Sequence, residues 1–304
     1  MRLVFCGTPA FAVPTLERVV AVGNEVLAVI TQPDRPRGRG QHAAAPPVKE
    51  AALRLGLRVE QPEKVRRPEA VELLRTLAPD AMVVVGYGQI IPQAVIDLAP
   101  LGIINVHASL LPKYRGAGPI QWAIIRGETR TGVTTMRIDA GLDTGDILLK
   151  RETEIGAEEN AVDLGRRLAV MGADLLVETL AGIAAGAIVP EKQDSSRATY
   201  APLLRKEDGL IDWALPAGEI HNRVRGLQPW PVAYTRFRGQ TLHIWKSRVS
   251  EADRASVRPL VVKCGAGALE LLELQLEGRK RVSAADFANG QRLTENEISG
   301  GMPA

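Results

Sequence analysis

Three side chains suited to acyl transfer, an amide, an imidazole and a carboxylate, stand beside strand-like runs of the sequence. Asn105 and His107 lie at the end of the apolar run 103–106, and alternate residues of an extended segment point to the same side. Asp143 follows the next apolar run, in a loop bounded by two glycines. An amide or an imidazole can donate to a developing oxyanion, and a carboxylate can hold the imidazole charged or accept a proton. The set predicts attack of an amine on a carbonyl, without a Ser or Cys nucleophile.

Each of these residues also has a common structural role. A histidine at a strand end is usually hydrogen-bonded within the fold, and Asn or Asp in Gly-containing loops usually form turns. We assign Asp146, which ends the same loop, to that structural class. The catalytic interpretation therefore depends on whether the fold brings Asn105, His107 and Asp143 together.

Short apolar runs alternate with helical patterns through the first two thirds of the chain, which is typical of an α/β domain. Predicted strands cover residues 2–6, 25–31, 58–60, 81–85, 103–106 and 133–138; predicted helices cover 48–55, 68–77 and 161–185, with another after Gly7. The pattern predicts a doubly wound, mostly parallel, Rossmann-like sheet with its ligands at the carboxyl ends of the strands. The turn that begins at Gly7 lacks the Gly-x-Gly-x-x-Gly spacing of dinucleotide sites, so we interpret it as a tight turn.

A length of 304 residues favours two domains. We place a catalytic domain at residues 1–189, a polar linker at 190–207 and a second domain at 208–304. In the second domain, short strand candidates cover residues 211–213, 233–238, 241–247, 260–264, 269–277 and 281–282. Such strands, several of them separated by Gly-containing turns, predict a small β-barrel of the five-stranded OB type.

The composition excludes several classes of protein. Cys6 and Cys264 are the only cysteines and the four histidines lack metal-ligand spacing, so we expect reduced thiols, no disulfide framework and no metal. The N-terminus lacks a signal-peptide pattern, and no window approaches about 18 uninterrupted apolar residues. We therefore expect a soluble, cytoplasmic monomer that binds no membrane. The net charge of +3 permits a nucleic-acid partner without requiring one.

A longer ordered pattern surrounds the candidate residues. It consists of Asn105-x-His107, Ser109-Leu110-Leu111-Pro112, Tyr114-Arg115-Gly116, Pro119-Ile120 and Gly141-Leu142-Asp143-Thr144-Gly145-Asp146. This pattern resembles the folate-dependent formyltransferase family. The likeness covers nearly the whole chain, and the motifs are too long and ordered for a chance match.

The resemblance implies roles for these residues. Asn105, His107 and Asp143 match the family's catalytic trio without substitution, and the implied formyl donor is 10-formyltetrahydrofolate, a co-substrate. The implied folate-contacting positions are Ser109, Leu110, Leu111 and Pro112, with Gly86 and Gly88 of a Gly-Tyr-Gly loop on the pterin side.

Within the family the formyl acceptor varies, and three features favour methionine carried by initiator tRNA. The first is the segment 31–40, which resembles a loop that reaches the end of the tRNA acceptor stem and carries Arg35, Arg37 and Arg39. Arginines on a Gly- and Pro-punctuated loop suit phosphates and unpaired bases, although a solvated lid has the same composition. The second is the linker and the Ile211-Asp212-Trp213 element, where Lys206 occupies a position expected near bound tRNA.

The third feature is the segment 220–250, which contains no Asp or Glu. Its basic residues, expected to contact tRNA phosphates, are Arg223, Arg225, Arg236, Arg238, Lys246 and Arg248. Its aromatic residues, expected in the core of the barrel rather than stacked on bases, are Trp230, Tyr234, Phe237 and Trp245. The segment after Arg39, residues 41–45, carries less positive charge than the resemblance leads us to expect.

Two other functions compete with this interpretation. A formyltransferase acting on a sugar-nucleotide amine would share the first domain, but the arginine loop at 35–39 argues against it. A non-catalytic RNA-binding protein with a vestigial folate site is the alternative from another class. The intact trio of Asn105, His107 and Asp143 argues against such a decayed site. A purine-pathway formyltransferase is less favoured, since it would lack the second domain.

Overall fold

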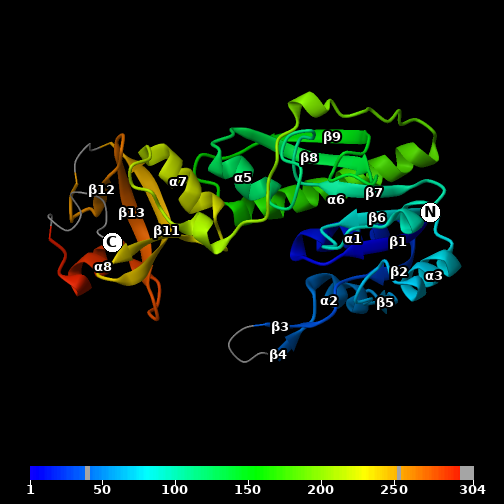
Figure 1. Cartoon of the computed structure of the whole chain (residues 1–304), viewed down its shortest axis with the longest axis horizontal. Helices are drawn as coiled ribbons and strands as arrows, with labels where there is room; N and C mark the ends of the chain where they lie inside the picture. Colours follow the sequence, from blue (N-terminus) through cyan, green and yellow to red (C-terminus); the bar gives the residue numbers. More distant parts are fainter. Residues whose placement is uncertain (38–41, 252–254, 295–304) are drawn as a thin grey trace. The chain divides into compact units, whose positions relative to one another are not determined.

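The computed structural model describes residues 1–37, 42–251 and 255–294, without the side chains of residues 37, 42 and 43. The chain forms two compact units (Figure 1). The first comprises Met1–Gly116, Thr131–Thr153 and Gly165–Tyr200, and the second comprises Ala117–Arg130, Glu154–Leu164 and Ala201–Ala304. Two short segments of the sequence before residue 189 thus pack with the C-terminal part of the chain. No described helix is both long and apolar enough to cross a membrane.

A seven-stranded sheet forms the centre of the first unit, with the order β5-β2-β1-β6-β7-β8-β9. Its strands are β1 (Arg2–Gly7), β2 (Glu25–Ile30), β5 (Val59–Glu60), β6 (Ala81–Val85), β7 (Ile103–His107), β8 (Arg130–Arg137) and β9 (Ile147–Glu154). The first five run parallel, and β8 runs antiparallel to β7. Every residue of β6 is buried, as its run of valines predicts for a strand covered on both faces. The predicted mostly parallel sheet is confirmed; β9 was not predicted.

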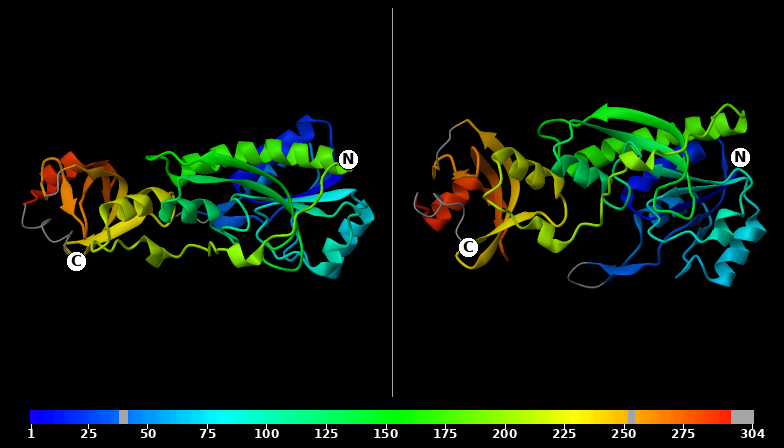
Figure 2. Two further views of the ribbon diagram at one scale, coloured as in Figure 1. Left: turned by 90° about the horizontal axis from the view of Figure 1, so that it is seen from above. Right: turned by 45° about the horizontal axis from the view of Figure 1, so that its top comes forward.

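Helices cover both faces of this sheet (Figures 1 and 2). They are α1 (Val13–Ala21), α2 (Pro47–Arg54), α3 (Pro68–Leu77), α4 (Gln93–Ile96) and α6 (Ala161–Ala184). Helix α6 lies against β7 and β8, where a side chain at Gly172 would meet Val106 and Val133. The ion pair between Arg18 and Asp174 joins α1 to the same face. On the other face, α3 and α4 pack on β1, β2 and β6 in one apolar cluster, so the sheet is doubly wound as predicted.

Proline residues begin several of these helices. The α3 helix starts at Pro68, whose fixed φ suits the first helical turn. Its apolar residues Val71 and Leu74 recur at helical spacing and face the core. The helix ends where Ala78 adopts a left-handed φ of 46°, a conformation that often ends helices. The sequence therefore predicts this helix with its observed bounds.

The second unit contains a five-stranded antiparallel sheet, in which β10-β11-β13-β12 are neighbours and β14 pairs with β13. Its elements are α5 (Pro119–Ile125), η3 (Lys206–Gly209), α7 (Ala217–Gly226), β10 (Ala233–Phe237), β11 (Gln240–Ser250), β12 (Val261–Lys263), β13 (Ala268–Leu276), β14 (Val282–Ser283) and α8 (Ala284–Gln291). The core of this unit joins α7 and α8 to the sheet, with Phe237 and Phe287 in edge-to-face contact. The predicted small C-terminal β domain is confirmed.

The second unit differs from the sequence predictions at three points. Residues 211–213 do not form the predicted strand. Leu210, just before them, makes an isolated bridge to Tyr234, and Asp212 accepts a hydrogen bond from the Ala214 N–H in a turn. Helix α7 was not predicted, and it buries Ile220 and Val224 at helical spacing. Phe237 is in the core as expected, whereas Trp230 is 55% exposed and the expectation for that ring was wrong.

Candidate active site

The strand β7, which pairs with the middle strand β6 of the sheet, carries two of the three predicted catalytic residues. Asn105 and His107 are 9% and 6% exposed, and by the alternation of a strand they project to the same side of the sheet. The strand pairs with β6 on one side and with β8 on the other, where His107 lies opposite Thr134. Hydrogen bonding on both edges holds the two functional side chains on a rigid element.

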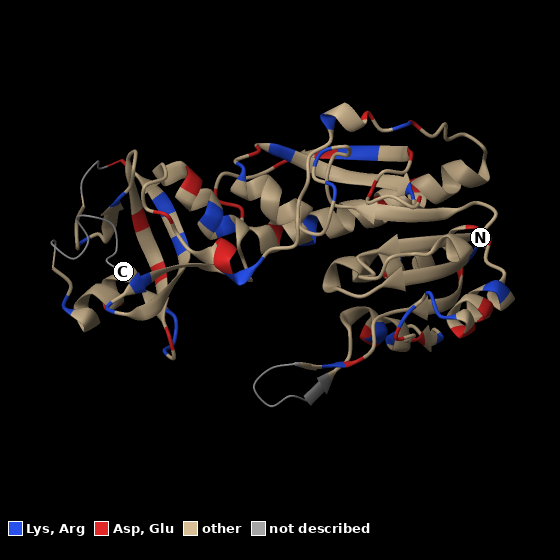
Figure 3. Ribbon diagram, in the orientation of Figure 1, with Lys and Arg blue, Asp and Glu red and all other residues tan. Residues whose placement is uncertain are grey.

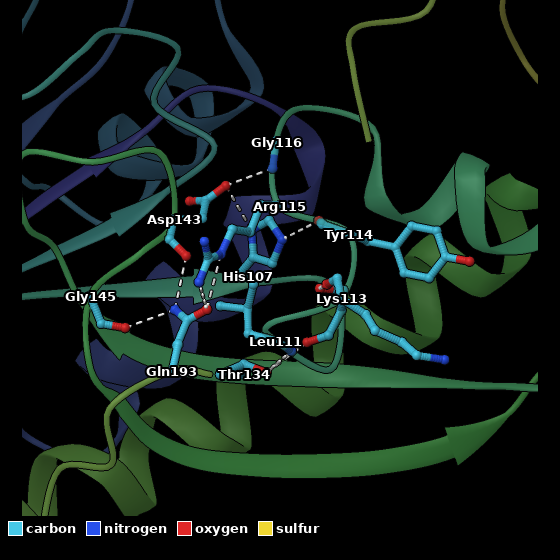
Figure 4. Close-up of polar contacts among 11 residues, drawn as sticks. His107, Leu111, Lys113, Tyr114, Arg115, Gly116, Thr134, Asp143, Gly145 and Gln193 are labelled. Carbon is cyan, nitrogen blue, oxygen red and sulfur yellow. Dashed lines mark hydrogen bonds and ion pairs between the residues drawn. The ribbon is translucent and has the colours of Figure 1, made fainter. Parts of the chain in front are cut away.

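The imidazole of His107 lies between a backbone carbonyl and a carboxylate (Figure 4). Its Nε2 is 2.9 Å from the carbonyl oxygen of Tyr114, and its Nδ1 is 3.7 Å from Oδ2 of Asp143. A carbonyl oxygen only accepts hydrogen bonds, so Nε2 must carry a hydrogen. The Nδ1 position therefore faces Asp143 and is where the ring can hold a second proton. The structure thus brings His107 and Asp143 together across sheet and loop.

The loop that follows β7 is fixed against β8. The Leu111 N–H donates to Oγ1 of Thr134 at 3.1 Å, and that hydroxyl donates to the Ser109 carbonyl at 2.7 Å. Within the loop, Oγ of Ser109 donates to the carbonyl of Lys113 at 2.6 Å. These bonds give the segment that contains the proposed folate-contacting residues Ser109, Leu110, Leu111 and Pro112 a defined shape.

The loop that carries Asp143 also has a defined geometry. Asp143 has a left-handed φ of 52°, and its Oδ2 accepts a hydrogen bond of 2.8 Å from the Gly116 N–H. The Thr144 hydroxyl contacts both carboxylate oxygens of Asp139. At Gly145 a Cβ would lie 2.0 Å from the Arg137 carbonyl oxygen, so only glycine fits this close approach.

Gln193, from the segment interpreted as a linker, reaches the Asp143 loop, and Arg115 of the Tyr-Arg-Gly motif holds Gln193. Nε2 of Gln193 donates to the carbonyls of Asp143 and Gly145, both at 2.8 Å. Arg115 is 2% exposed and donates to Oε1 of Gln193 from both Nε, at 3.1 Å, and Nη2, at 2.8 Å. Figure 4 shows this chain of contacts beside the His107 ring. Sequence reasoning missed Gln193, which lies far from Asp143 along the chain and has no motif of its own.

The Gly86-Tyr87-Gly88 loop follows β6, the neighbour of β7. Gly86 and Gly88 have positive φ values of 57° and 83°, and both are exposed. The carbonyl of Tyr87 accepts hydrogen bonds from the Thr8 hydroxyl and the Gln32 amide, which tie this loop to the ends of β1 and β2. At Gly86 a Cβ would lie 2.9 Å from Cγ of Pro9. The loop therefore presents bare backbone at the carboxyl edge of the sheet, where the family resemblance predicts the pterin.

The arginine loop begins as a two-stranded hairpin, β3 (Arg35–Arg37) and β4 (His42–Ala44). Asp34, just before it, accepts hydrogen bonds from Gln61 and from Lys49, whose ammonium is 2.7 Å from Oδ2; these bonds lower the pKa of Asp34. Arg35 is exposed. Arg39 lies outside the described residues, as does the side chain of Arg37. Asp34, at the described base of the hairpin, is thus held by an ion pair with Lys49, and the next residue, Arg35, is exposed to solvent.

The basic residues of the second unit have different environments. Arg225 is 8% exposed, and its guanidinium donates to the carbonyls of Gly156 and Glu159 and to Oδ1 of Asn222. It links α7 to the segment before α6, so burial and internal bonding remove it from an accessible tRNA surface. The prediction for this one residue is therefore corrected. Arg223 is half-buried on the same helix.

Two basic residues of strand β11 have acidic neighbours across the sheet. Lys246 lies opposite Glu273 of β13, and Arg248 forms an ion pair of 2.7 Å with Glu270. Figure 3 shows basic and acidic positions side by side on this sheet. The segment 220–250 lacks acids in its own sequence, but the fold supplies them from β13. The predicted phosphate contacts of Lys246 and Arg248 would have to compete with these cross-strand neighbours.

Lys206 and Arg236 line a common depression of about 250 Å³. Tyr234, His243 and Glu277 also line it, and the rings of Tyr234 and His243 are in edge contact. Burial lowers the pKa of His243, whose Nδ1 has no hydrogen-bond partner among the described residues. The depression brings together Lys206 and Arg236, two predicted tRNA-binding residues. The guanidinium of Arg238 lies over the ring of Phe237, the last residue of β10.

A doubly wound sheet with an amide and an imidazole at the carboxyl end of β7, and a loop carboxylate beside the imidazole, defines an enzyme of the acyl-transfer class. A formyl transferase family model matches residues 1–180, and a model of the formyl transferase C-terminal domain matches residues 203–292. The chain belongs to the formyl transferase family. In the part of the chain that the structure describes, no three His, Cys, Asp or Glu side chains are grouped to hold a metal ion.

Relatives of high identity cover the whole chain. A methionyl-tRNA formyltransferase of Solibacter usitatus is 76% identical over 307 residues, which cover 99% of each chain. A methionyl-tRNA formyltransferase of Koribacter versatilis is 57% identical over 300 residues, covering 96% of each. The solved structure of WlaRD, a sugar 3N-formyl transferase with dTDP and 5-N-formyl-THF, has a TM-score of 0.69 and 19% identity, covering 92% of this chain and 99% of that one. At this identity the last comparison shows the fold alone.

Proposed function

We propose that this enzyme transfers the formyl group of 10-formyltetrahydrofolate to the amino group of methionine esterified to initiator tRNA. The observation that carries the proposal is the His107 ring, held between the Tyr114 carbonyl and the Asp143 carboxylate, in a chain that a full-length methionyl-tRNA formyltransferase matches at 76% identity. The proposal includes action in the cytoplasm as a monomer.

The site can stabilise the charge that develops when an amine attacks a formyl carbon. As the new C–N bond forms, the carbonyl electron pair becomes an oxyanion, for which the Asn105 amide and the Nδ1–H of protonated His107 are donors. Asp143 stabilises the charged ring and is placed to receive the proton that the attacking amine loses. Collapse of the adduct breaks the bond to the carrier nitrogen, which takes up the proton lost by the attacking amine and leaves as a neutral secondary amine. Formylmethionyl-tRNA and tetrahydrofolate result.

The folate would be held by backbone and short side chains at the same edge of the sheet. Bound there, it supplies an activated formyl group. Gly86 and Gly88 present exposed backbone after β6, and any Cβ at Gly86 would meet Pro9. Ser109 and Leu111 follow His107 in the sequence, and hydrogen bonds fix the loop that carries them. This arrangement supports a flat ring on the glycine loop, with the formyl end directed toward Asn105 and His107.

The tRNA would be held by basic side chains. The proposed contacts are Arg35, Arg37 and Arg39 of the segment 31–40, with Lys206, Arg223, Arg236, Arg238, Lys246 and Arg248 of the second unit. A hairpin at the carboxyl edge of the sheet supports reading of an acceptor end close to the chemistry. The depression between Lys206 and Arg236 supports phosphate or base contact.

Formyl transfer to methionine charged on initiator tRNA, compared with methionine charged on elongator tRNA, tests the proposal. We expect kcat/KM for the initiator to exceed that for the elongator by ~10²-fold, the discrimination that a few polar contacts supply. Equal rates would remove tRNA reading from the proposal. Transfer to neither tRNA, with transfer to a sugar-nucleotide amine, would replace the acceptor and keep the chemistry.

A further inference from the structure

We infer that Gln193, anchored by Arg115, is a positioning residue that sets the distance between Asp143 and His107 during formyl transfer. The inference rests on the proposed function and adds to it a residue outside the trio. It starts from a set of contacts that joins four segments of the first unit: the end of β7, the loop 114–116, the loop 143–145 and the segment that carries Gln193 (Figure 4).

The set of contacts has two sides. On one side, the loop after β7 touches both catalytic groups: the Tyr114 carbonyl accepts from Nε2 of His107, and the Gly116 N–H donates to Oδ2 of Asp143. Arg115 stands between those two contact points in the sequence. Its guanidinium donates a hydrogen bond to Oε1 of Gln193, and Nε2 of Gln193 donates to the carbonyls of Asp143 and Gly145. A displacement of Gln193 therefore moves both loops.

The backbone of this site needs such support because it is strained. Tyr114 and Asp143 are both non-glycine residues with left-handed φ values, 62° and 52°. Such conformations persist only where surrounding contacts over-determine them. The amide group of Gln193 holds the loop on both sides of Thr144, and the Thr199 hydroxyl accepts from the Tyr114 N–H at 2.9 Å.

The segment from Glu191 to Tyr200 thus makes successive contacts with β9, the Asp143 loop and the loop 114–116. It begins with a two-way backbone bridge between Glu191 and Ile147. It continues through Gln193 to the Asp143 loop and ends with Thr199, whose carbonyl accepts from the Arg115 N–H at 2.9 Å. Arg115 is 2% exposed, and two of its donors converge on one amide oxygen, so it has a single favoured position from which to fix Gln193.

Two substitutions of Gln193 separate anchoring from positioning. Gln193→Glu has nearly the same shape and still accepts from Arg115, but its carboxylate cannot donate to the loop carbonyls. Gln193→Ala loses both functions. We expect kcat to fall by about 10- to 100-fold in both variants, with KM for the folate and the tRNA within about 3-fold, because a shift near 1 Å at a reacting group costs on that order.

Asn24→Ala is the matched control. Asn24 is a half-buried amide that donates to the Val19 carbonyl at 3.2 Å, at the start of β2 and therefore at the opposite edge of the sheet. Its loss removes one amide–carbonyl bond without touching the site. Wild-type kcat in Asn24→Ala, with a melting temperature no higher than that of Gln193→Ala, shows that lost stability does not explain the fall in kcat; a matching fall in the control overturns the inference.

A second readout is independent of activity. The chain has four histidines, so the ring signals of ¹⁵N-histidine-labelled protein can be assigned, with His107→Asn identifying the His107 signal. We expect that signal to shift in both Gln193 variants and to stay in place in Asn24→Ala. An unmoved His107 signal, a wild-type kcat in Gln193→Glu, or a loss confined to KM overturns the inference. If the wild-type enzyme formylates no tRNA, the proposed function fails, and the His107 signal still decides the positioning role.

Discussion

The Asp143 carboxylate offers the most direct test of the chemistry. Asp143→Asn keeps the shape of the side chain, and its amide oxygen can still accept from the Gly116 N–H. It removes the negative charge that lies 3.7 Å from Nδ1 of His107. If the charge supports a protonated ring, formyl transfer must slow while substrate binding stays nearly unchanged.

The magnitude follows from the distance and the burial. Both side chains are largely buried, at 7% and 17% exposure, so an effective dielectric constant of about 20 applies. At 3.7 Å two unit charges then interact by about 4.5 kcal/mol, which corresponds to about 10³-fold in rate. Part of this energy offsets desolvation, so we expect kcat to fall by about 10²- to 10³-fold.

The assay is single-turnover formyl transfer to methionyl-tRNA at saturating folate, which reports the chemical step without product release. Asp146→Asn makes the same change three residues later, at a residue whose carbonyl accepts from the Arg137 N–H and to which we give no chemical role. We expect wild-type rates in this control. A rate within about 5-fold of wild type in Asp143→Asn would refute the role of the charge.

Two further predictions concern the interior of the protein. Arg225→Met should lower the free energy of unfolding by about 2–3 kcal/mol in a denaturant titration, because the carbonyls of Gly156 and Glu159 lose a charged donor; unchanged stability with weaker tRNA binding would return Arg225 to the tRNA surface. Burial raises the pKa of Cys6 to about 12 and of Cys264 to about 11. Both thiols stay protonated at about pH 8, so a thiol reagent should modify them only after unfolding, and rapid labelling of the native enzyme would contradict their burial.

Much of the first unit follows from local sequence. The strand β6 and the helix α3 have the bounds that their apolar patterns predict, because a strand buried on both faces and an amphipathic helix are each visible within about ten residues. The prediction of the candidate trio also rests on local sequence. Asn105 and His107 share a face because of strand alternation, and the glycines around Asp143 indicate a tight loop.

Tertiary structure alone decided which distant groups meet. Gln193 reaches the Asp143 loop because the chain returns from α6 along Ile147, a contact with no sequence motif. The segment 190–207 has no periodicity, so it was interpreted as a linker, yet its first half holds the site together. Hydrogen bonds to backbone carbonyls leave no trace in residue types, since every residue has such a carbonyl.

The charge environment of the second unit likewise depends on tertiary contacts that the sequence does not reveal. The segment 220–250 contains no acid, and the sequence therefore determines an excess of basic side chains in this segment. The fold pairs that strand with β13, where Glu270 binds Arg248, and it turns Arg225 inward toward carbonyls of residues before α6. Charge composition is set along the chain, whereas the field that tRNA meets depends on neighbours across the sheet. The residue types determine which chemical groups this enzyme has, and tertiary packing decides which of those groups can contact a substrate.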